Sequence, residues 1–389
     1  MATTIPAIPL VIGGAGVLGL AIGKRIINQF PNLEFLILEK NSKPGMITSS
    51  RSSEVIHAGL YYPTSSLKAE SCVKGKVILK EYLNERNIKY NNCGKYIVAT
   101  TAEEVIKLEQ LKHQAMMNGV TDVYMLSGTD VAKMEPNVSC KMALFSPSTS
   151  VFDVHSYINN LELDVLASPR STILYNCTIE DVSKDDKFII KTNQGLVQSS
   201  LFINVTGLNA IELVSNFKFY PQELLPQQYY CKGNYFKFIK NIRPFNSLIY
   251  PMPSHGGLGI HSTLDVNNVV KFGPDTEWLS HNNTTTFDST IYSVDSSRAE
   301  QFYRSIRQYY PNLPDDSLEP YYSGIRPKLI GPNKMNNNAY RNNLHDFIID
   351  TELKHKVNGL INVFGYESPG ITSSLYISNL ICKIISMIM

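Results

Sequence analysis

The stretch that decides the fold is residues 9–23, PLVIGGAGVLGLAIG, where a short apolar run leads into Gly14, Gly16 and Gly19. This Gly-x-Gly-x-x-Gly spacing predicts a buried strand, a tight turn and a helix, and residues 34–39 (EFLILE) predict the next strand. In such a unit the glycines allow the turn, the approach of a pyrophosphate and close packing of helix on strand. The N–H groups and dipole at the helix N-terminus favour phosphate.

An acid closes this unit. Glu39 ends the second predicted strand, 25 residues after Gly14. An acid there accepts hydrogen bonds from the adenosine ribose and repels a 2′-phosphate. We therefore predict a dinucleotide site for FAD or NAD rather than NADP, the alternative being a glycine turn without a ligand. The fingerprint alone does not choose between FAD and NAD.

The composition excludes several classes of protein. The 389 residues exceed one ordinary core and predict two domains, and the 43% hydrophobic fraction excludes a disordered chain. With 36 Lys+Arg against 34 Asp+Glu and no basic run, we expect no nucleic-acid partner. Six scattered cysteines without a CxxC pair predict neither a metal site nor a disulfide framework, which favours a reducing compartment.

The two ends of the chain favour a cytoplasmic location. Residues 1–14 (MATTIPAIPLVIGG) lack the basic segment of a secretory signal, and no arginine precedes Arg25, as a mitochondrial presequence would require. The apolar residues 375–389 contain Lys383 and number 15, whereas a membrane span needs about 20. We expect a buried helix there; peripheral membrane contact and a mitochondrial location are less favoured.

The rest of the chain alternates helix and strand signals. Residues 365–370 predict a turn into a terminal helix with Ser368 as N-cap and Pro369 in its first turn, and such a helix N-terminus suits the negative charge of a reduced flavin. The other segments are predicted as a strand (172–182), a hairpin (187–204), a β-rich region (229–272), a mostly helical region (286–310), an Asn-rich surface loop (331–343) and a last strand (360–364).

Longer motifs extend along essentially the whole chain. They are residues 48–63 (TSSRSSEVIHAGLYYP), 66–69 (SLKA), 93–99 (CGKYIVA), 233–236 (GNYF), 248–253 (LIYPMP), 257–261 (GLGIH), 272–275 (FGPD) with Glu277-Trp278, 324–328 (GIRPK) and 365–374 (GYESPGITSS). In this order they resemble the L-2-hydroxyglutarate dehydrogenase/oxidase family, a member of the FAD-dependent D-amino-acid-oxidase-like superfamily. Two positions depart from that pattern: Ser52 replaces the usual Asn, and Tyr366 replaces the usual Ile.

The resemblance implies an α/β fold with two domains. A discontinuous Rossmann-type FAD-binding domain comprises residues 1–88, 150–220 and 325–389, and a β-rich α+β substrate domain comprises residues 89–149 and 221–324. The implied cofactor contacts are Gly14, Gly16, Gly19, Glu39, Lys40, Ser49, Arg51, Val182, Gly207, Gly370, Ile371 and Thr372.

The implied reaction is oxidation of L-2-hydroxyglutarate, or a close 2-hydroxy acid, to 2-oxoglutarate. A hydride passes to flavin N5 while a base takes the hydroxyl proton. Another oxidase of the superfamily, acting on an amino acid or on glycerol 3-phosphate, is the alternative, although a phosphate requires a larger cationic cluster than the sequence reveals. A non-catalytic flavin-binding protein is the third hypothesis. The electron acceptor (oxygen, quinone or a carrier flavoprotein), covalent attachment of FAD and the oligomeric state stay open.

Two histidines are candidates for the base, because a neutral imidazole accepts protons at working pH. His57 lies in the segment that the family places beside the flavin; the alternative is a packing histidine. His261 lies on a predicted alternating strand and shares a face with Thr263, and its alternative role is a structural hydrogen bond. His155 is a weaker candidate. We expect the remaining histidines at the surface: His113, His255, His281, His345 and His355.

Arg326 is the strongest candidate for binding a carboxylate. Its guanidinium matches a carboxylate in bidentate geometry, and an arginine on a strand of the substrate domain has this role in the wider superfamily. The alternative is an arginine that pairs with a structural acid. Tyr235 is a second donor to the same carboxylate, and Lys95 a weaker one. Glu367 is acidic beside the predicted flavin, so we expect it to make structural bonds.

Overall fold

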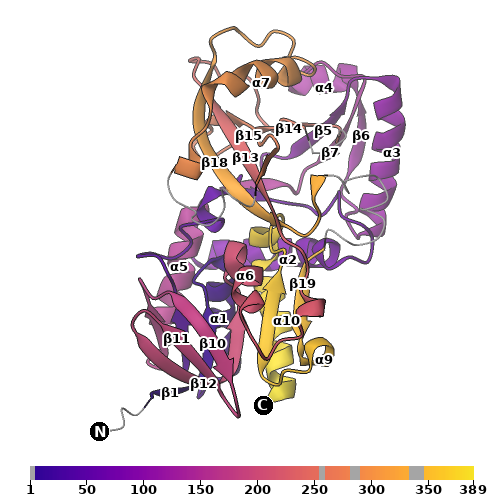
Figure 1. Cartoon of the computed structure of the whole chain (residues 1–389). Helices are drawn as coiled ribbons and strands as arrows, with labels where there is room; N and C mark the ends of the chain where they lie inside the picture. Colours follow the sequence, from indigo (N-terminus) through magenta and orange to yellow (C-terminus); the bar gives the residue numbers. More distant parts are fainter. Residues whose placement is uncertain (1–4, 254–258, 281–289, 333–345) are drawn as a thin grey trace.

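The computed structural model describes residues 5–253, 259–280, 290–332 and 346–389. The chain forms two lobes, each built on its own sheet, and both chain ends lie in the lobe shown at the bottom of Figure 1. The loop predicted over 331–343 falls almost entirely outside the described residues. So do His255, His281 and His345.

The first lobe contains the dinucleotide unit predicted from residues 9–39. Its eight-stranded sheet has a parallel centre in which β1 pairs with both β2 and β12, while β9 and β20 extend it on either side. Strands buried on both faces require nearly continuous apolar runs, and β1 and β2 supply them. The strands are β1 (Ala7–Gly13), β2 (Phe35–Leu38), β9 (Ser171–Leu174), β10 (Ile179–Lys184), β11 (Phe188–Thr192), β12 (Gly195–Asn204), β19 (Ile348–Thr351) and β20 (Leu360–Phe364).

Helices cover both faces of this sheet. A core of buried residues joins one face to four helices, and a second core on the other face, which includes residues of β10 and β11, joins the sheet to a short helix, α6 (Ala210–Ser215). The four helices are α1 (Val17–Gln29), α2 (Leu67–Glu85), α5 (Val154–Leu166) and α10 (Gly370–Ile388). Helices on both faces of a mainly parallel sheet define a doubly wound fold, whose ligands bind at the carboxyl ends of the strands.

The terminal helix α10 belongs to this core. Ile377, Ile381 and Ile385 recur every four residues and are fully buried beside α1, and burial of each side chain contributes about 1.5–3 kcal/mol. By length and composition alone α10 could cross a membrane, but half of its most apolar window is buried inside the protein. It begins at Gly370 after Pro369, without a side-chain cap, so the predicted capping role of Ser368 is wrong.

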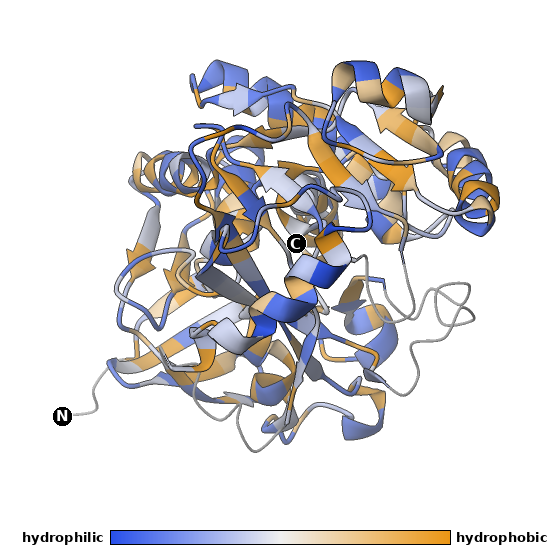
Figure 2. Cartoon of the chain, turned by 90° about the horizontal axis from the view of Figure 1, so that it is seen from above, coloured by the Kyte–Doolittle hydropathy of each residue, from blue (hydrophilic) through white to orange (hydrophobic). Residues whose placement is uncertain are grey.

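The second lobe is a nine-stranded, mostly antiparallel sheet. Its longest pairing joins β13 to β18, with Cys231 opposite Arg326 and Gly233 opposite Gly324. The strands are β5 (Lys95–Ala99), β6 (Tyr124–Ser127), β7 (Met142–Ser146), β13 (Tyr229–Phe238), β14 (Leu248–Pro251), β15 (Ser262–Leu264), β16 (Val270–Phe272), β17 (Glu277–Leu279) and β18 (Leu318–Lys328). The helices α3 (Ala102–Met117), α4 (Gly128–Met134) and α7 (Ala299–Ile306) lie around it, and Figure 2 shows mixed polar and apolar residues along the outer helices.

A third, three-stranded sheet is formed by short strands that come, in the chain order, among the strands of the two larger sheets. It pairs β8 (Ser150–Phe152) with β3 (Val55–Ile56) and β4 (Tyr90–Asn91). The exact limits of the two domains remain a prediction. Residues 325–328, predicted to begin the last FAD-binding segment, lie on β18 in the second sheet.

One further expectation about secondary structure is wrong, and a second is confirmed in an interrupted form. The strand predicted over 172–182 is two strands, β9 and β10, because the chain turns at Asn176, which has φ 54°. In the region predicted as helical over 286–310, the described residues form two 3₁₀ turns (290–292 and 296–298) before the eight-residue α7. Polar residues that bond locally interrupt this segment: the Asp295 side chain accepts from the N–H of Ser297.

Candidate active site

The glycine turn has the geometry that the sequence predicts. Gly14 has φ +104°, and its N–H donates to the Leu38 carbonyl at 2.8 Å. A Cβ on Gly19 would lie 2.0 Å from the Gly14 carbonyl oxygen, so only glycine lets α1 approach β1 this closely. At Gly16 a Cβ would meet only the Ser49 hydroxyl, at 3.4 Å. The space above the helix N-terminus is therefore open to a ligand.

Glu39 is held in place beside this turn. One carboxylate oxygen accepts the N–H of Ala15 at 2.8 Å, and the other accepts the backbone and side-chain N–H groups of Asn41. The next residue, Lys40, donates to the Asn209 side chain at 2.8 Å. A buried, fully oriented carboxylate at the carboxyl end of β2 is the group that a ribose hydroxyl requires.

A cavity of about 610 Å³ runs from this turn to the second sheet. That volume is within the usual range for small-molecule sites. Of the predicted site residues, those that line it are Gly14, Gly16, Glu39, Lys40, Ser49, Arg51, His57, Gly207, Tyr235, His261, Arg326, Gly370, Ile371 and Thr372.

Two predicted cofactor residues lie elsewhere. Gly19 is one helical turn into α1 and contributes packing rather than a surface. Val182 is buried in the core on β10 and does not line the cavity. Residues 177–180, which follow the end of β9, line it instead. The position after a parallel strand is the signal that points to them, but the prediction of one continuous strand over 172–182 concealed that strand end.

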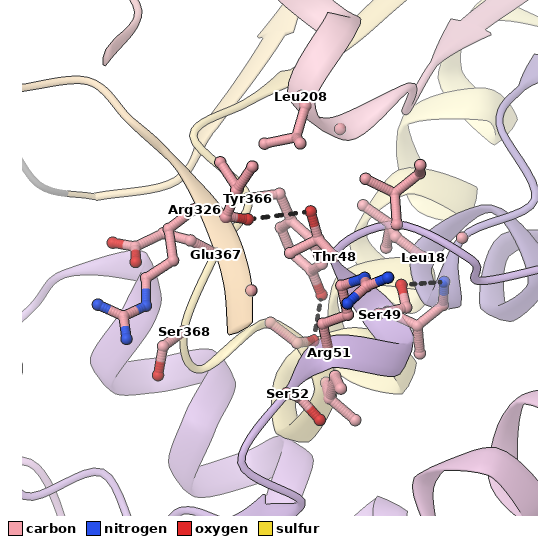
Figure 3. A pocket seen from close by; sticks show the side chains of 18 of the residues that line it. Leu18, Thr48, Ser49, Arg51, Ser52, Leu208, Arg326, Tyr366, Glu367 and Ser368 are labelled. Carbon is pink, nitrogen blue, oxygen red and sulfur yellow. Dashed lines mark hydrogen bonds between the residues drawn. The ribbon is translucent and has the colours of Figure 1, made fainter. Parts of the chain in front are cut away.

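Polar groups at the far side of the turn remain available for a ligand. Arg51 stacks over the Tyr292 ring at 3.8 Å and donates to the Ser323 carbonyl, yet its Nε is buried without a hydrogen-bond partner. The Ser49 hydroxyl accepts the N–H of Val17 at 3.1 Å. Figure 3 shows Ser49 and Arg51 on one side of the cavity and Arg326 and Glu367 on the other.

Arg326 is unpaired. Within the described parts of the chain its guanidinium makes no ion pair or hydrogen bond, although it lines the cavity. A Cβ on Gly233 would lie 2.8 Å from the Arg326 Nη2, so the glycine makes room for the guanidinium. The alternative prediction, an arginine that pairs with a structural acid, is therefore not supported by an ion pair among the described residues. A half-buried cation that faces a cavity favours an anionic ligand.

Aromatic rings and the two candidate histidines line the same cavity as this cation. The Tyr235 ring stacks on Tyr322 with centroids 4.5 Å apart, and His261 stacks on Tyr250 at 3.5 Å. His261 is 4% exposed and immediately precedes β15, and Thr263 is fully buried. Burial raises the pKa of Tyr235 well above 10, which keeps its hydroxyl a proton donor to a hydrogen bond.

His57 is neutral in this environment. Its backbone N–H donates to the Thr372 hydroxyl at 3.1 Å, which ties β3 to the start of α10. Burial lowers the pKa of His57 to about 3, and the nearby Lys95 ammonium adds to this effect. The imidazole therefore lines the cavity in its unprotonated form, with a free ring-nitrogen lone pair, over the whole physiological pH range.

Lys95 lies behind the site rather than in it. The residue is 1% exposed and does not line the cavity, so direct binding of a carboxylate, its weaker predicted role, finds no support. Its ammonium lies 4.8 Å from the centroids of both the Tyr61 and Tyr250 rings. Burial lowers the pKa of Lys95 to about 7.

The other described histidines are not part of the site. His155 and His113 are exposed, and His155 does not line the cavity. His355 was expected at the surface but is buried, with its Nε2 3.8 Å from an oxygen of the buried Asp350. The reason is tertiary: β19 and β20 bury Asp350, and the ring packs beside Tyr220.

Glu367 makes structural bonds, as its position beside the predicted flavin suggested. Lys68 and Lys328 both donate to one of its carboxylate oxygens, at 2.7 and 2.8 Å. All three residues line the cavity. Lys68 and Lys328 were not among the predicted site residues, although both lie in motifs of the family, because nothing in the local sequence pattern indicates that they converge.

The turn, the oriented acid and the orphaned Arg51 Nε fit a dinucleotide whose far end reaches the second sheet. Together with the doubly wound fold, they define a two-lobed, dinucleotide-dependent oxidoreductase.

The family model described as FAD dependent oxidoreductase matches residues 10–384. Two solved structures share the fold. L-alpha-glycerophosphate oxidase from Mycoplasma pneumoniae has a TM-score of 0.84 at 20% identity, covering 98% of this chain and 95% of that one. Glycine oxidase from Geobacillus kaustophilus has a TM-score of 0.79 at 18% identity, covering 99% and 96%.

Similarity to named relatives shows which family within the FAD dependent oxidoreductases the chain belongs to. L-2-hydroxyglutarate dehydrogenase, mitochondrial, of Arabidopsis thaliana is 40% identical over 95% of this chain and 81% of that protein. The L-2-hydroxyglutarate dehydrogenase of Escherichia coli (strain K12) is 26% identical over 83% and 82%. Glycerol 3-phosphate dehydrogenase of Caloramator mitchellensis is 27% identical over 96% and 73%. The chain belongs to the FAD dependent oxidoreductases and, within them, to the L-2-hydroxyglutarate dehydrogenase family. The predicted fold class and the FAD cofactor are confirmed.

Proposed function

We propose that this enzyme oxidises L-2-hydroxyglutarate to 2-oxoglutarate. The observation that carries the proposal is the unpaired guanidinium of Arg326, which faces the same cavity as His57 and His261. A cation fixes the carboxylate of a 2-hydroxy acid, and a neutral imidazole takes its hydroxyl proton. The relatives named L-2-hydroxyglutarate dehydrogenase support the choice of acid.

The residues of the chain divide the work as follows. Bound FAD supplies the hydride acceptor. Arg326 binds the C1 carboxylate, and Tyr235 donates a further hydrogen bond to it. His57 accepts the hydroxyl proton, because its low pKa keeps the ring neutral and unprotonated before the reaction. His261, held against Tyr250, orients the same hydroxyl.

The FAD contacts are also part of the proposal. Glu39 binds the ribose, and the N-terminus of α1 with Gly14 and Gly16 binds the pyrophosphate. Arg51 and Ser49 supply further donors between the lobes, and Gly370, Ile371 and Thr372 bring the N-terminus of α10 toward the ring.

Anaerobic flavin reduction tests the substrate and the residue roles together. We expect L-2-hydroxyglutarate to bleach the flavin absorbance while the D enantiomer leaves it unchanged. Arg326→Gln should raise the substrate concentration for half-maximal reduction about 100-fold or more, because the fork of two hydrogen bonds is lost. His57→Asn and His261→Asn, made separately, should retain FAD. If both histidine variants are reduced at the wild-type rate, the base assignment is wrong.

Glycerol 3-phosphate is a second candidate substrate, because one observation favours it. The sequence analysis found no cationic cluster suited to a phosphate, yet the structure brings Lys68 and Lys328 into the cavity that holds Arg326. The same anaerobic titration with glycerol 3-phosphate decides between the two acids. A flavin reduced by neither compound would favour the non-catalytic alternative.

The cellular location and the electron acceptor remain proposals. Some relatives are named mitochondrial, whereas the Escherichia coli enzyme carries no such label. We keep the cytoplasm as the proposed location, with peripheral membrane contact less favoured. Cell fractionation with detection of the native chain tests the location, and reoxidation of the reduced flavin by oxygen or by a soluble quinone tests the acceptor.

A further inference from the structure

Two lysines and one glutamate form a buried cluster in the wall of the cavity. Lys68 and Lys328 lie 2.7 and 2.8 Å from the same oxygen of Glu367, and the Lys68 and Glu367 side chains are 6% and 5% exposed. We call these three residues the lysine cluster. One lysine is enough to neutralise the glutamate, so the second leaves a net positive charge in a place where an uncompensated charge is costly.

Each member is fixed by the fold. The N-terminus of α2, which carries Lys68, is capped by the Ser66 hydroxyl and by Asp346, whose carboxylate accepts the N–H groups of Leu67 and Lys68. Lys328 lies two residues after Arg326 on β18, so both side chains leave the same face of that strand. Glu367 lies in the turn before α10, and Figure 3 shows it beside Arg326.

Three other carboxylates that line the cavity have partners of their own. Asp275 pairs with Arg298 at 2.6 Å, and Glu54 pairs with Lys271 at 2.9 Å. Asp346 accepts backbone N–H groups at a helix N-terminus, where the dipole favours a negative charge. Taken by themselves, Arg326, Lys68, Lys328 and Glu367 carry a formal net charge of +2, which matches the −2 of one dicarboxylate.

We propose that Lys68 and Lys328, oriented by Glu367, bind the second carboxylate of the substrate, while Arg326 binds the first. The inference rests on the proposed function and deepens it, because it assigns the preference for a dicarboxylic 2-hydroxy acid to two named side chains. Glu367 is a positioning residue, because one of its carboxylate oxygens accepts hydrogen bonds from both ammonium groups and so keeps them close together. Each ammonium keeps further N–H donors for a ligand.

The test compares two substrates that differ only at the far end. L-2-hydroxyglutarate carries a carboxylate where L-2-hydroxypentanoate carries a methyl group. In anaerobic flavin reduction, Lys328→Met and Lys68→Met should each lower the efficiency with L-2-hydroxyglutarate about 10- to 100-fold, the range for one charge-assisted hydrogen bond. Their efficiency with L-2-hydroxypentanoate should change less than threefold, and Lys328→Arg should recover part of the loss.

The variants are designed to fold and to have a matched control. Each single substitution leaves Glu367 paired with the other lysine, so no buried acid is left without a partner. Lys74→Met is the control, because Lys74 is on the same helix as Lys68 but its side chain is 57% exposed. The flavin spectrum and reduction potential of each variant should match those of the wild type.

The outcomes separate the two proposals. A wild-type flavin that L-2-hydroxyglutarate does not reduce overturns the proposed function and the subsite with it. A wild-type flavin that is reduced, with variants that lose both substrates equally or shift the reduction potential, overturns the subsite alone, because the lysines then act on the flavin or the fold. Variants that retain full efficiency with the dicarboxylate also overturn it.

Discussion

Replacing Lys95 by methionine is expected to stabilise the protein, most strongly near neutral pH. Lys95 is almost completely buried, and burial lowers its pKa from 10.5 to about 7. Keeping this amine in the folded chain at pH 7 therefore costs about 4 kcal/mol relative to the unfolded chain, as an upper estimate. Methionine fills similar space without a charge.

The pH dependence follows from the direction of the shift. Between pH 7 and 10.5 the unfolded chain binds the proton that the folded chain has released, so the stability of the wild type rises with pH. The cost of Lys95 falls to about 1.5 kcal/mol at pH 9.5. The advantage of Lys95→Met should shrink by about 2.5–3 kcal/mol over this range. His57 does not interfere, because its pKa is lowered from 6.5 to about 3 and its contribution is constant above pH 7.

Urea unfolding of the FAD-loaded protein at pH 7 and at pH 9.5 measures this difference. Lys107→Met, at an exposed position on α3, is the control and should change the free energy of unfolding by less than about 0.5 kcal/mol at both pH values. A variant that is less stable than the wild type at pH 7, or whose advantage does not change with pH, would refute the reasoning. Loss of the Lys95 charge should also raise the pKa of His57, which NMR detects.

Three further predictions follow from the geometry of the cavity. Gly233→Ala places a Cβ 2.8 Å from Nη2 of Arg326 and 2.6 Å from Cβ of Pro274, so we expect at least a tenfold rise in KM with FAD retained; an unchanged KM would contradict the placement of the guanidinium. Gly16→Ala should fold but bind FAD at least tenfold more weakly, whereas Gly19→Ala should fail to fold stably, because its Cβ clashes with the backbone at 2.0 Å; FAD titration and circular dichroism separate the two. The rate of flavin reduction should show no loss attributable to His57 as the pH falls from 8 to 5, because the pKa of His57 is about 3; an acid limb that His57→Asn removes would show otherwise.

Local signals explain why the cofactor half of the site was predictable. Gly14, Gly16, Gly19 and Glu39 lie within one strand–turn–helix–strand unit, and each role depends on neighbours a few residues away. One of the wrong expectations also has a local cause. The strand predicted over 172–182 is divided by a turn, because a β-like composition does not reveal where a strand stops.

The family motifs predicted more of the site residues than the residue spacing did. They pointed to His57, His261, Tyr235 and Arg326, and the structure brings all four to one cavity. They did not indicate that Arg326 makes no ion pair with the described residues, since ion pairing depends on three-dimensional distance. Nor did they indicate that His355, polar and apparently exposed in the sequence, packs against the buried Asp350.

The sequence by itself determined the βαβ unit and the dinucleotide site, because short-range periodicity and spacing encode them, and the resemblance of its longer motifs indicated the family. Only the tertiary structure decided the electrostatics of the substrate end. Lys68 and Glu367 are 299 positions apart, and Lys328 meets them from a different sheet. Burial then sets their charges and those of Lys95 and His57. Charge, pKa and pairing depend on which groups the folded chain excludes from water, and no local pattern contains that information.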